Sequence, residues 1–257
     1  MKKIYTVLVC VSVLIGACSK DEENLPVKEV TPFENLLKDN NLMAYYPFNG
    51  SANDNKNSYD GIVKDFDATQ DRKGNNSSAY KSTTASAEIS FPAAIPFKNE
   101  SFSMSFWFKV PTNLHDAVFT ILSKREACKK GDFIQVAYKK GSNELTVEMR
   151  SDNVMTDLNG SATADLENVN PTEWTHVVII KDNSTRKTTI YVNGEEKVST
   201  PWSLPNGIVS IDNTAKFKVG HSPCAISGLN NFIGSIDELI LLKKALTPQE
   251  ISILKNQ

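Results

Sequence analysis

The chain has 257 residues, a formal net charge of −2 and charged residues at 23% of its positions. A weakly acidic sequence without a basic cluster argues against nucleic acid as a partner, because the phosphate backbone requires a positively charged surface. The length suits one β-rich domain of about 200 residues, and no apolar stretch beyond the N-terminal leader is long enough to span a bilayer.

The N-terminal residues have the features of an export leader. Lys2 and Lys3 precede an uncharged apolar run over 4–15, which has the size of a signal h-region. The small pair Gly16-Ala17 then leads to Cys18. This pattern resembles the lipobox of bacterial lipoproteins, and the resemblance implies cleavage before Cys18 and stable anchoring of that residue by several acyl chains. The alternative is an ordinary secretory signal, with Cys18 as a plain thiol.

The segment after Cys18 reads Ser19-Lys20-Asp21-Glu22-Glu23. It resembles the surface-export signal of glycan-degrading Gram-negative bacteria, which implies a lipid-anchored protein on the outer membrane, facing the cell exterior. A short acidic run is also typical of any solvated linker, so this alternative stays open. We expect a signal peptide over 1–17, a lipidated N-terminus and tether over 18–32, and a folded domain over 33–257.

Strands dominate the expected domain. After a short helical turn within 33–41, segments that alternate apolar and polar residues recur with turn signals between them, which predicts roughly a dozen strands. Asn193-Gly194 tolerates the positive φ of a type I′ hairpin turn. The run Thr247-Pro248-Gln249-Glu250 is a capping box that predicts a short C-terminal helix. The main expected strands lie within 42–48, 102–108, 133–139, 145–149, 174–181, 187–192, 217–220 and 232–242.

Five motifs follow one another in the domain: 42–54 (LMAYYPFNGSAND), 71–80 with DRKG and SAY, 102–109 (FSMSFWFK), 173–177 (EWTHV) leading to 191–194 (YVNG), and 234–239 (GSIDEL) leading to 245–247. Together they resemble the laminin-G-like, concanavalin A-like jelly-roll domains of bacterial surface proteins, over about residues 40–254. The resemblance implies an all-β, two-sheet antiparallel jelly-roll sandwich, often with one structural calcium ion. Such domains bind glycans, bind proteins or serve as accessory modules, so the fold does not decide the function.

The calcium expectation rests on two positions of the family pattern. Asp54, in the loop after the first strand, and Asp237, in the last motif, match the aspartates that approach each other in the family. Asn53 and Asp60 would add oxygens toward the six to eight that calcium requires. Lys56 departs from the pattern and brings a positive charge toward the site. The alternative is that Asp54 organises a turn and Asp237 faces solvent.

Two cysteines belong to the domain, since Cys10 leaves with the leader and Cys18 carries lipid. An exported chain meets oxidising conditions, which predicts a disulfide between Cys128 and Cys224. The alternative is a pair of buried free thiols.

Aromatic side chains are the candidate sugar-binding groups. Trp202 stands between two prolines in a loop, where it either presents a rigid ring to solvent or plugs the end of the sandwich. Trp107 lies on the strand face opposite to Phe106 and its apolar neighbours, where it either contacts a sugar or packs under a loop. Trp174 and Tyr138 are expected in the core.

Catalysis finds little support in the sequence. A glycosidase needs paired carboxylates on one face, whereas the strand pattern sends Asp237 and Glu238 to opposite faces. We therefore expect a non-catalytic, lipid-anchored surface protein that binds glycan or mediates adhesion. The alternative is a structural or protein-interaction subunit of an outer-membrane surface complex.

Overall fold

The computed structural model describes residues 29–82, 84–93, 95, 97–128, 131–151, 159–203, 207–224 and 229–257. The chain divides into two compact units, Met1–Val30 and Thr31–Gln257. The second unit contains all the helices and strands of the described chain. The leader, Cys18 and most of the expected tether lie outside the described residues. The described part of the chain contains no helix with the length and apolar character that crossing a bilayer requires.

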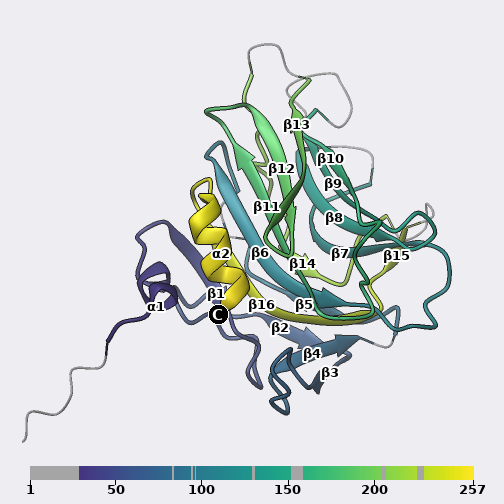
Figure 1. The fold of residues 1–257 in the computed structure, drawn as a ribbon. Helices are drawn as coiled ribbons and strands as arrows, with labels where there is room; N and C mark the ends of the chain where they lie inside the picture. The colour runs from purple at the N-terminus through teal and green to yellow at the C-terminus, as the bar shows by residue number, and fades with distance from the viewer. Residues whose placement is uncertain are drawn as a thin grey trace, which may run out of the picture. The chain divides into compact units, whose positions relative to one another are not determined.

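Sheet A contains eight strands of the described chain (Figure 1). In spatial order they are β13 (Glu195–Pro201), β12 (Lys187–Val192), β11 (Thr175–Asp182), β6 (Phe102–Lys109), β16 (Gly234–Leu242), β4 (Ala79–Ser82) and β3 (Phe66–Thr69), with β1 (Leu42–Tyr46) also paired to β16. Every pairing in this sheet is antiparallel, which places residues from distant parts of the sequence opposite one another on β6 and β16.

Sheet B also contains eight strands of the described chain. In spatial order they are β10 (Ala162–Asp165), β9 (Glu144–Arg150), β8 (Phe133–Lys139), β7 (Val118–Lys124), β14 (Lys218–Val219), β5 (Glu88–Ser90) and β2 (Ile62–Lys64), with β15 (Leu229–Asn231) also paired to β7. The pair of β15 with β7 runs parallel, and the other pairs are antiparallel.

The all-β two-sheet sandwich predicted from the sequence is confirmed. Alternating segments form the long strands because one face of each meets the core. The Asn193-Gly194 hairpin is also confirmed, with φ of 51° and 84° at its two central residues. The prediction of a dozen strands falls short of the two eight-stranded sheets, since β2, β5 and β15 have three residues each and carry no readable alternation.

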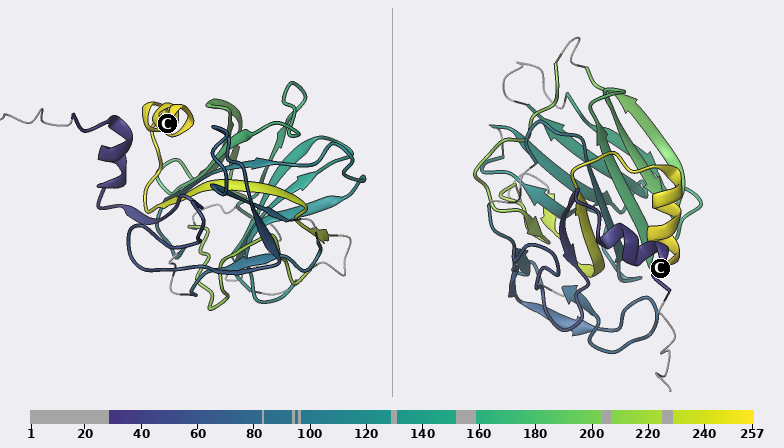
Figure 2. Two further views of the ribbon diagram at one scale, coloured as in Figure 1. Left: turned by 90° about the horizontal axis from the view of Figure 1, so that it is seen from below. Right: turned by 90° about the vertical axis from the view of Figure 1, so that its left-hand side faces the viewer.

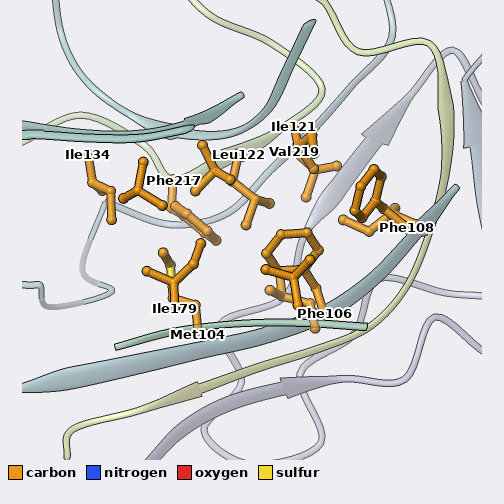
Figure 3. Packing of buried hydrophobic residues seen from close by; sticks show 14 of the residues in the cluster. Met104, Phe106, Phe108, Ile121, Leu122, Ile134, Ile179, Phe217 and Val219 are labelled. Atoms are coloured by element: carbon orange, nitrogen blue, oxygen red, sulfur yellow. The ribbon is translucent and has the colours of Figure 1, made fainter. Parts of the chain in front are cut away.

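The core lies between the two sheets (Figure 3). Met104, Phe106 and Phe108 of β6 meet side chains of β7, β8 and β14, and all three are fully buried. Alternate residues of β6 therefore project away from the core, onto the outer face of sheet A. Tyr138 is 1% exposed, as expected for a core residue.

Two helices cover part of that outer face (Figure 2). They are α1 (Pro32–Leu37) and α2 (Pro248–Asn256), and each begins with a capping box that includes a proline. The predicted capping box of the C-terminal helix, Thr247 with Glu250, is confirmed. Ile251 and Leu254 of α2 pack on Val178 and other apolar residues of the outer face. In the described part of the chain, the apolar contacts of the two helices do not include β4, the C-terminal end of β6 or the N-terminal end of β16.

Candidate functional site

Four residues lie side by side across the outer face of sheet A. Lys109 of β6 is opposite Ser235 of β16, and Ser235 is opposite Lys81 of β4. Trp174, the residue before β11, continues the series next to Lys109. Phe108, the neighbour of Lys109 along β6, belongs to the core, so Lys109 projects from the other face. We call Lys81, Ser235, Lys109 and Trp174 the lysine row.

A cleft of about 520 Å³ opens at the lysine row. Lys81, Ser235 and Lys109 line it together with the start of the loop after β6. The lining includes two lysines and no Asp or Glu. Its hydroxyl groups come from Thr69, Ser82, Thr112, Thr172 and Ser235. Hydroxyl and ammonium groups can donate hydrogen bonds, and the hydroxyls can also accept them, so the cleft suits a polar ligand rich in oxygen.

Trp174 stands at the border of this cleft. Its side chain is half-buried, and the Lys109 ammonium lies 4.8 Å from the centre of its ring. The expectation that Trp174 belongs to the core is wrong, because the strand face that it shares with His176 is the outer face of sheet A. A cation–π contact of this kind contributes about 0.5–1 kcal/mol at an exposed site, so the ring helps to hold Lys109 in place.

A second row lies directly beside the first, closer to the helices. His176 is opposite Trp107, and Trp107 is opposite Asp237. The Trp107 ring is 4.9 Å from the His176 ring, and the Arg72 guanidinium lies 5.0 Å from its centre. Trp107 is thus covered by a residue of the β3–β4 loop. The structure supports packing under a loop, because Arg72 and His176 both contact the ring, which is half-buried. We call His176, Trp107 and Asp237 the histidine row.

Arg72 binds two adjacent carboxylates of β16. Its Nη1 lies 2.8 Å from Asp237 Oδ2 and 3.6 Å from Glu238 Oε1. The strand bulges between Asp237 and Ile240, and Glu238 has a φ of 51°. This bulge turns Glu238 toward the same arginine as Asp237. The expectation that the two acids lie on opposite faces is therefore wrong, since it assumes regular alternation along the strand.

Burial dominates the electrostatics of the histidine row. It raises the pKa of Asp237 to about 7, with a further rise from the charge of Glu238 that Arg72 partly offsets. Burial also lowers the pKa of His176 to about 3. His176 Nδ1, Trp107 Nε1 and Asp237 Oδ1 are buried without a hydrogen-bond partner among the described residues. Each such atom costs about 1–3 kcal/mol of the free energy of unfolding. The contacts of Arg72 with Asp237 and Trp107 help to offset this cost.

Asp54 organises its own loop. Its two carboxylate oxygens accept hydrogen bonds from the backbone N–H groups of Tyr45, Lys56, Asn57 and Tyr59, at distances of 2.9–3.2 Å. Asp60 accepts from the Asp54 N–H, and Asn53 is exposed. N–H groups aimed at both oxygens occupy the positions that a cation would take.

The residues do not fit the expected calcium site. Asp54 is bound by backbone donors, whereas Asp237 is paired with Arg72. In the described part of the chain, no group of three or more His, Cys, Asp or Glu residues is placed to hold a metal ion. Of the two alternatives to a calcium site, the turn role of Asp54 is observed, whereas Asp237 is buried rather than facing solvent.

Trp202 is buried at the end of sheet A. It is 7% exposed, its Nε1 donates a 3.0 Å hydrogen bond to Thr188 Oγ1, and Lys181 Nζ lies 5.1 Å from its ring. The idea of Trp202 as an exposed sugar platform is corrected: the residue plugs the sandwich, because its ring and its N–H both find partners there.

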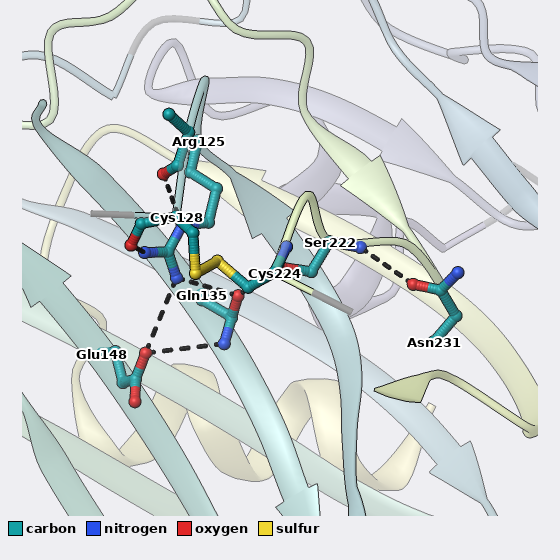
Figure 4. The surroundings of a disulfide bond; sticks show 8 residues. Arg125, Cys128, Gln135, Glu148, Ser222, Cys224 and Asn231 are labelled. Atoms are coloured by element: carbon teal, nitrogen blue, oxygen red, sulfur yellow. Dashed lines mark hydrogen bonds and ion pairs between the residues drawn. A yellow bond between two sulfur atoms is a disulfide. The ribbon is translucent and has the colours of Figure 1, made fainter. Parts of the chain in front are cut away.

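The disulfide between Cys128 and Cys224 is present (Figure 4). It lies beside a buried polar cluster on sheet B, in which Arg125 donates to Gln135 Oε1 and Ser222 donates to the same oxygen. Glu148 lies 3.7 Å from Arg125. In the described part of sheet B, these polar groups bind one another.

A groove of about 620 Å³ runs between the start of α1 and the end of α2. Phe33 and Tyr45 line it, with Glu238 and Gln257 among its polar groups. The groove therefore combines aromatic and polar side chains, and it serves as the natural comparison for the cleft at the lysine row.

The laminin G family model for the concanavalin A-like lectin/glucanases superfamily matches residues 82–252. The chain belongs to this family. The match includes β6, β11 and β16, which carry the histidine row and part of the lysine row, and both cysteines of the disulfide.

Solved structures share the concanavalin A-like fold at low identity. Domain 4 of AbnA, an extracellular arabinanase from Geobacillus stearothermophilus solved with arabinotriose, has 19% identity and a TM-score of 0.56, covering 83% of this chain and 98% of that one. The binding domain of Paraclostridial Mosquitocidal Protein 1 has 17% identity and a TM-score of 0.62, covering 84% and 52%. The ligand binding domain of botulinum neurotoxin serotype D, solved with N-acetylneuraminic acid, has 17% identity and a TM-score of 0.60, covering 84% and 50%.

The chain spans about half the length of the toxin binding domains it matches. A search of curated proteins found no match. These likenesses show the fold.

Sequence reasoning missed the lysine row and Arg72. Lys81, Lys109 and Ser235 are ordinary polar positions of three strands, and only strand pairing brings them together. A usable signal exists in retrospect, since Lys109 and Trp174 each lie at the end of a strongly alternating segment.

Proposed function

We propose that this protein is a non-catalytic glycan-binding protein and that its site is the cleft at the lysine row. The observation that carries the proposal is the chemistry of that cleft, which gathers five hydroxyl side chains and two lysines beside a half-buried tryptophan. A concave site with convergent polar groups is the default position for a ligand. Family membership supports glycan as the ligand class, as do the arabinotriose and N-acetylneuraminic acid complexes of two structurally similar proteins.

The cleft is preferred to the α1–α2 groove because of the side chains that line it. Among the described residues, the lining of the cleft has five hydroxyl groups, two lysines and no Asp or Glu. Glu238 lines the groove, and its carboxylate lies 3.6 Å from Arg72.

The proposed location is the outer membrane, with the protein anchored through Cys18 and facing the cell exterior. The support is the leader pattern, in which a basic start and an apolar run end at Gly16-Ala17-Cys18. Metabolic labelling with a palmitate analogue should mark the wild-type protein and leave Cys18→Ala unlabelled. Protease shaving of intact cells should degrade the anchored protein, and survival of the full chain would contradict the outward orientation.

The absence of catalysis is part of the proposal. A two-carboxylate glycosidase holds its carboxyl groups on either side of the scissile bond, roughly 5–9.5 Å apart. The adjacent pair found here shares one arginine, and Asp237 is 1% exposed. Release of reducing ends from any bound polysaccharide would overturn this part of the proposal.

A glycan array probed with the full-length protein in detergent tests the function. We expect binding to at least one polysaccharide, with a loss of about two- to fivefold for Trp174→Ala, because Lys109 loses its cation–π contact. Phe33→Ala is the matched control, since it removes an aromatic ring from the α1–α2 groove. A loss with Phe33→Ala alone would move the site to the groove. Failure to bind any glycan would favour the structural or protein-interaction subunit.

A further inference from the structure

The charged side chains that line the cleft are all positive. The whole chain is weakly acidic, yet both charged residues that line the cleft are lysines. Lys81 and Lys109 flank Ser235 in the register of sheet A, one strand away on each side. Neighbouring strands are about 4.8 Å apart, so the backbone positions of these three residues span about 10 Å.

These two lysines lack the acidic partners that other lysines of the domain have. Lys218 Nζ lies 3.0 Å from Glu88, and Lys244 is paired with both Asp39 and Glu250. Among the described residues, neither Lys81 nor Lys109 forms an ion pair, although Asp67 stands opposite Lys81 in the register of β3 and β4. The contact that Lys109 makes is with the neutral ring of Trp174.

Unpaired ammonium groups in a concave site favour an anion. A cation held against an aromatic ring keeps its charge and its hydrogen-bond donors free for a ligand. Ser235 adds a hydroxyl donor between the two lysines, and the hydroxyls of Thr112 and Thr172 line the same cleft. A carboxylate placed over Ser235 would receive charge-assisted hydrogen bonds from both sides, which are about twice as strong as neutral ones.

We propose that the cleft binds acidic glycans and that Lys81 and Lys109 bind the carboxylate of a uronic acid residue. This inference rests on the proposed glycan-binding function and names its ligand class. Neutral sugar residues on either side of the uronic acid would contact the threonine hydroxyls. Binding should weaken as salt concentration rises, because charge attraction at a surface cleft is screened over about 8–10 Å.

The test compares polygalacturonic acid with its fully methyl-esterified form, using the full-length protein in detergent and biolayer interferometry. The two polymers share a backbone and differ in charge. We expect the acidic form to bind on the order of tenfold or more tightly, and Lys81→Gln and Lys109→Gln each to weaken it by on the order of tenfold. Lys187→Gln removes the same charge from an exposed position on β12 and should leave binding unchanged.

The possible results distinguish failure of the acidic preference from failure of the proposed glycan-binding function. Equal binding of the two polymers, or equal loss with Lys187→Gln, would overturn the acidic preference and leave glycan binding intact. Binding to neutral glycans of the array without binding to polygalacturonic acid would do the same. Failure to bind every glycan, acidic or neutral, would overturn the proposed function itself. Unfolding midpoints of the three glutamine variants, measured in parallel, identify any loss that comes from misfolding.

Discussion

Arg72 Nη1 donates a 2.8 Å hydrogen bond to Asp237 Oδ2, although the two residues are 165 positions apart in the sequence. The contact ties the β3–β4 loop to β16, and the guanidinium also covers the ring of Trp107. It forms a boundary between the helix-covered part of sheet A and the open lysine row. The buried Asp237 therefore belongs to the support of the cleft and not to its lining.

Asp237→Asn should change how stability depends on pH. Since burial raises the pKa of Asp237 to about 7, the folded protein holds a proton between about pH 4 and pH 7 that the unfolded chain releases. The free energy of unfolding that this group contributes therefore falls as pH rises through that window. Asp237→Asn removes this fall. His176 titrates in both proteins, so its opposite contribution cancels in their difference.

Urea unfolding of wild type and Asp237→Asn, measured at several pH values between about 4 and 8, checks this prediction. We expect the stability of the wild type to decline relative to the variant as pH rises, and to level off above about pH 7. Parallel stability curves would show that Asp237 titrates near its usual value.

Replacement of Trp202 should reduce stability and leave ligand binding intact. Trp202→Ala empties a buried site and should cost about 3–5 kcal/mol of the free energy of unfolding. Trp202→Phe keeps most of the ring volume but loses the hydrogen bond to Thr188, which should cost about 1 kcal/mol. Glycan affinity of the folded Trp202→Phe protein should equal that of wild type. A selective loss of affinity would return Trp202 to the candidate site.

Loss of the disulfide should destabilise the domain strongly. The two cysteines are 96 positions apart, and in the chain-entropy model a loop of about 100 residues corresponds to about 4–5 kcal/mol. The double variant Cys128→Ser, Cys224→Ser should unfold at a lower urea concentration than wild type. Addition of dithiothreitol should bring wild type to the same midpoint and leave the double variant unchanged. A wild-type midpoint that does not change when dithiothreitol is added would contradict the prediction.

Chelation should leave the thermal midpoint unchanged. Asp54 binds four backbone N–H groups, so its loop is organised by the protein itself. Asp54→Ala should instead cost at least about 2 kcal/mol, since several of these N–H groups lose their acceptor. Thermal unfolding with EDTA, with added calcium and for the variant measures both effects. A midpoint raised by calcium and lowered by EDTA would reinstate the metal site.

The sequence by itself determined the class of fold, the hairpin at Asn193-Gly194, the capping box at Thr247 and the pairing of Cys128 with Cys224. These features depend on local chemistry: the period of two in strands, the conformational freedom of Asn-Gly, side-chain capping, and the small number of cysteines in the domain. Nothing beyond neighbouring residues and a count of cysteines is needed to read them.

Only the tertiary structure decided the site. The lysine row gathers residues from β4, β6, β16 and the start of β11, and their proximity follows from strand order and register, which single segments do not encode. The bulge at Glu238 reverses the face that alternation predicts. Trp174 is half-buried although the sequence predicts a core position, and Trp202 takes the buried one of its two expected positions. Whether a ring is buried depends on what packs against it, and those partners come from elsewhere in the chain.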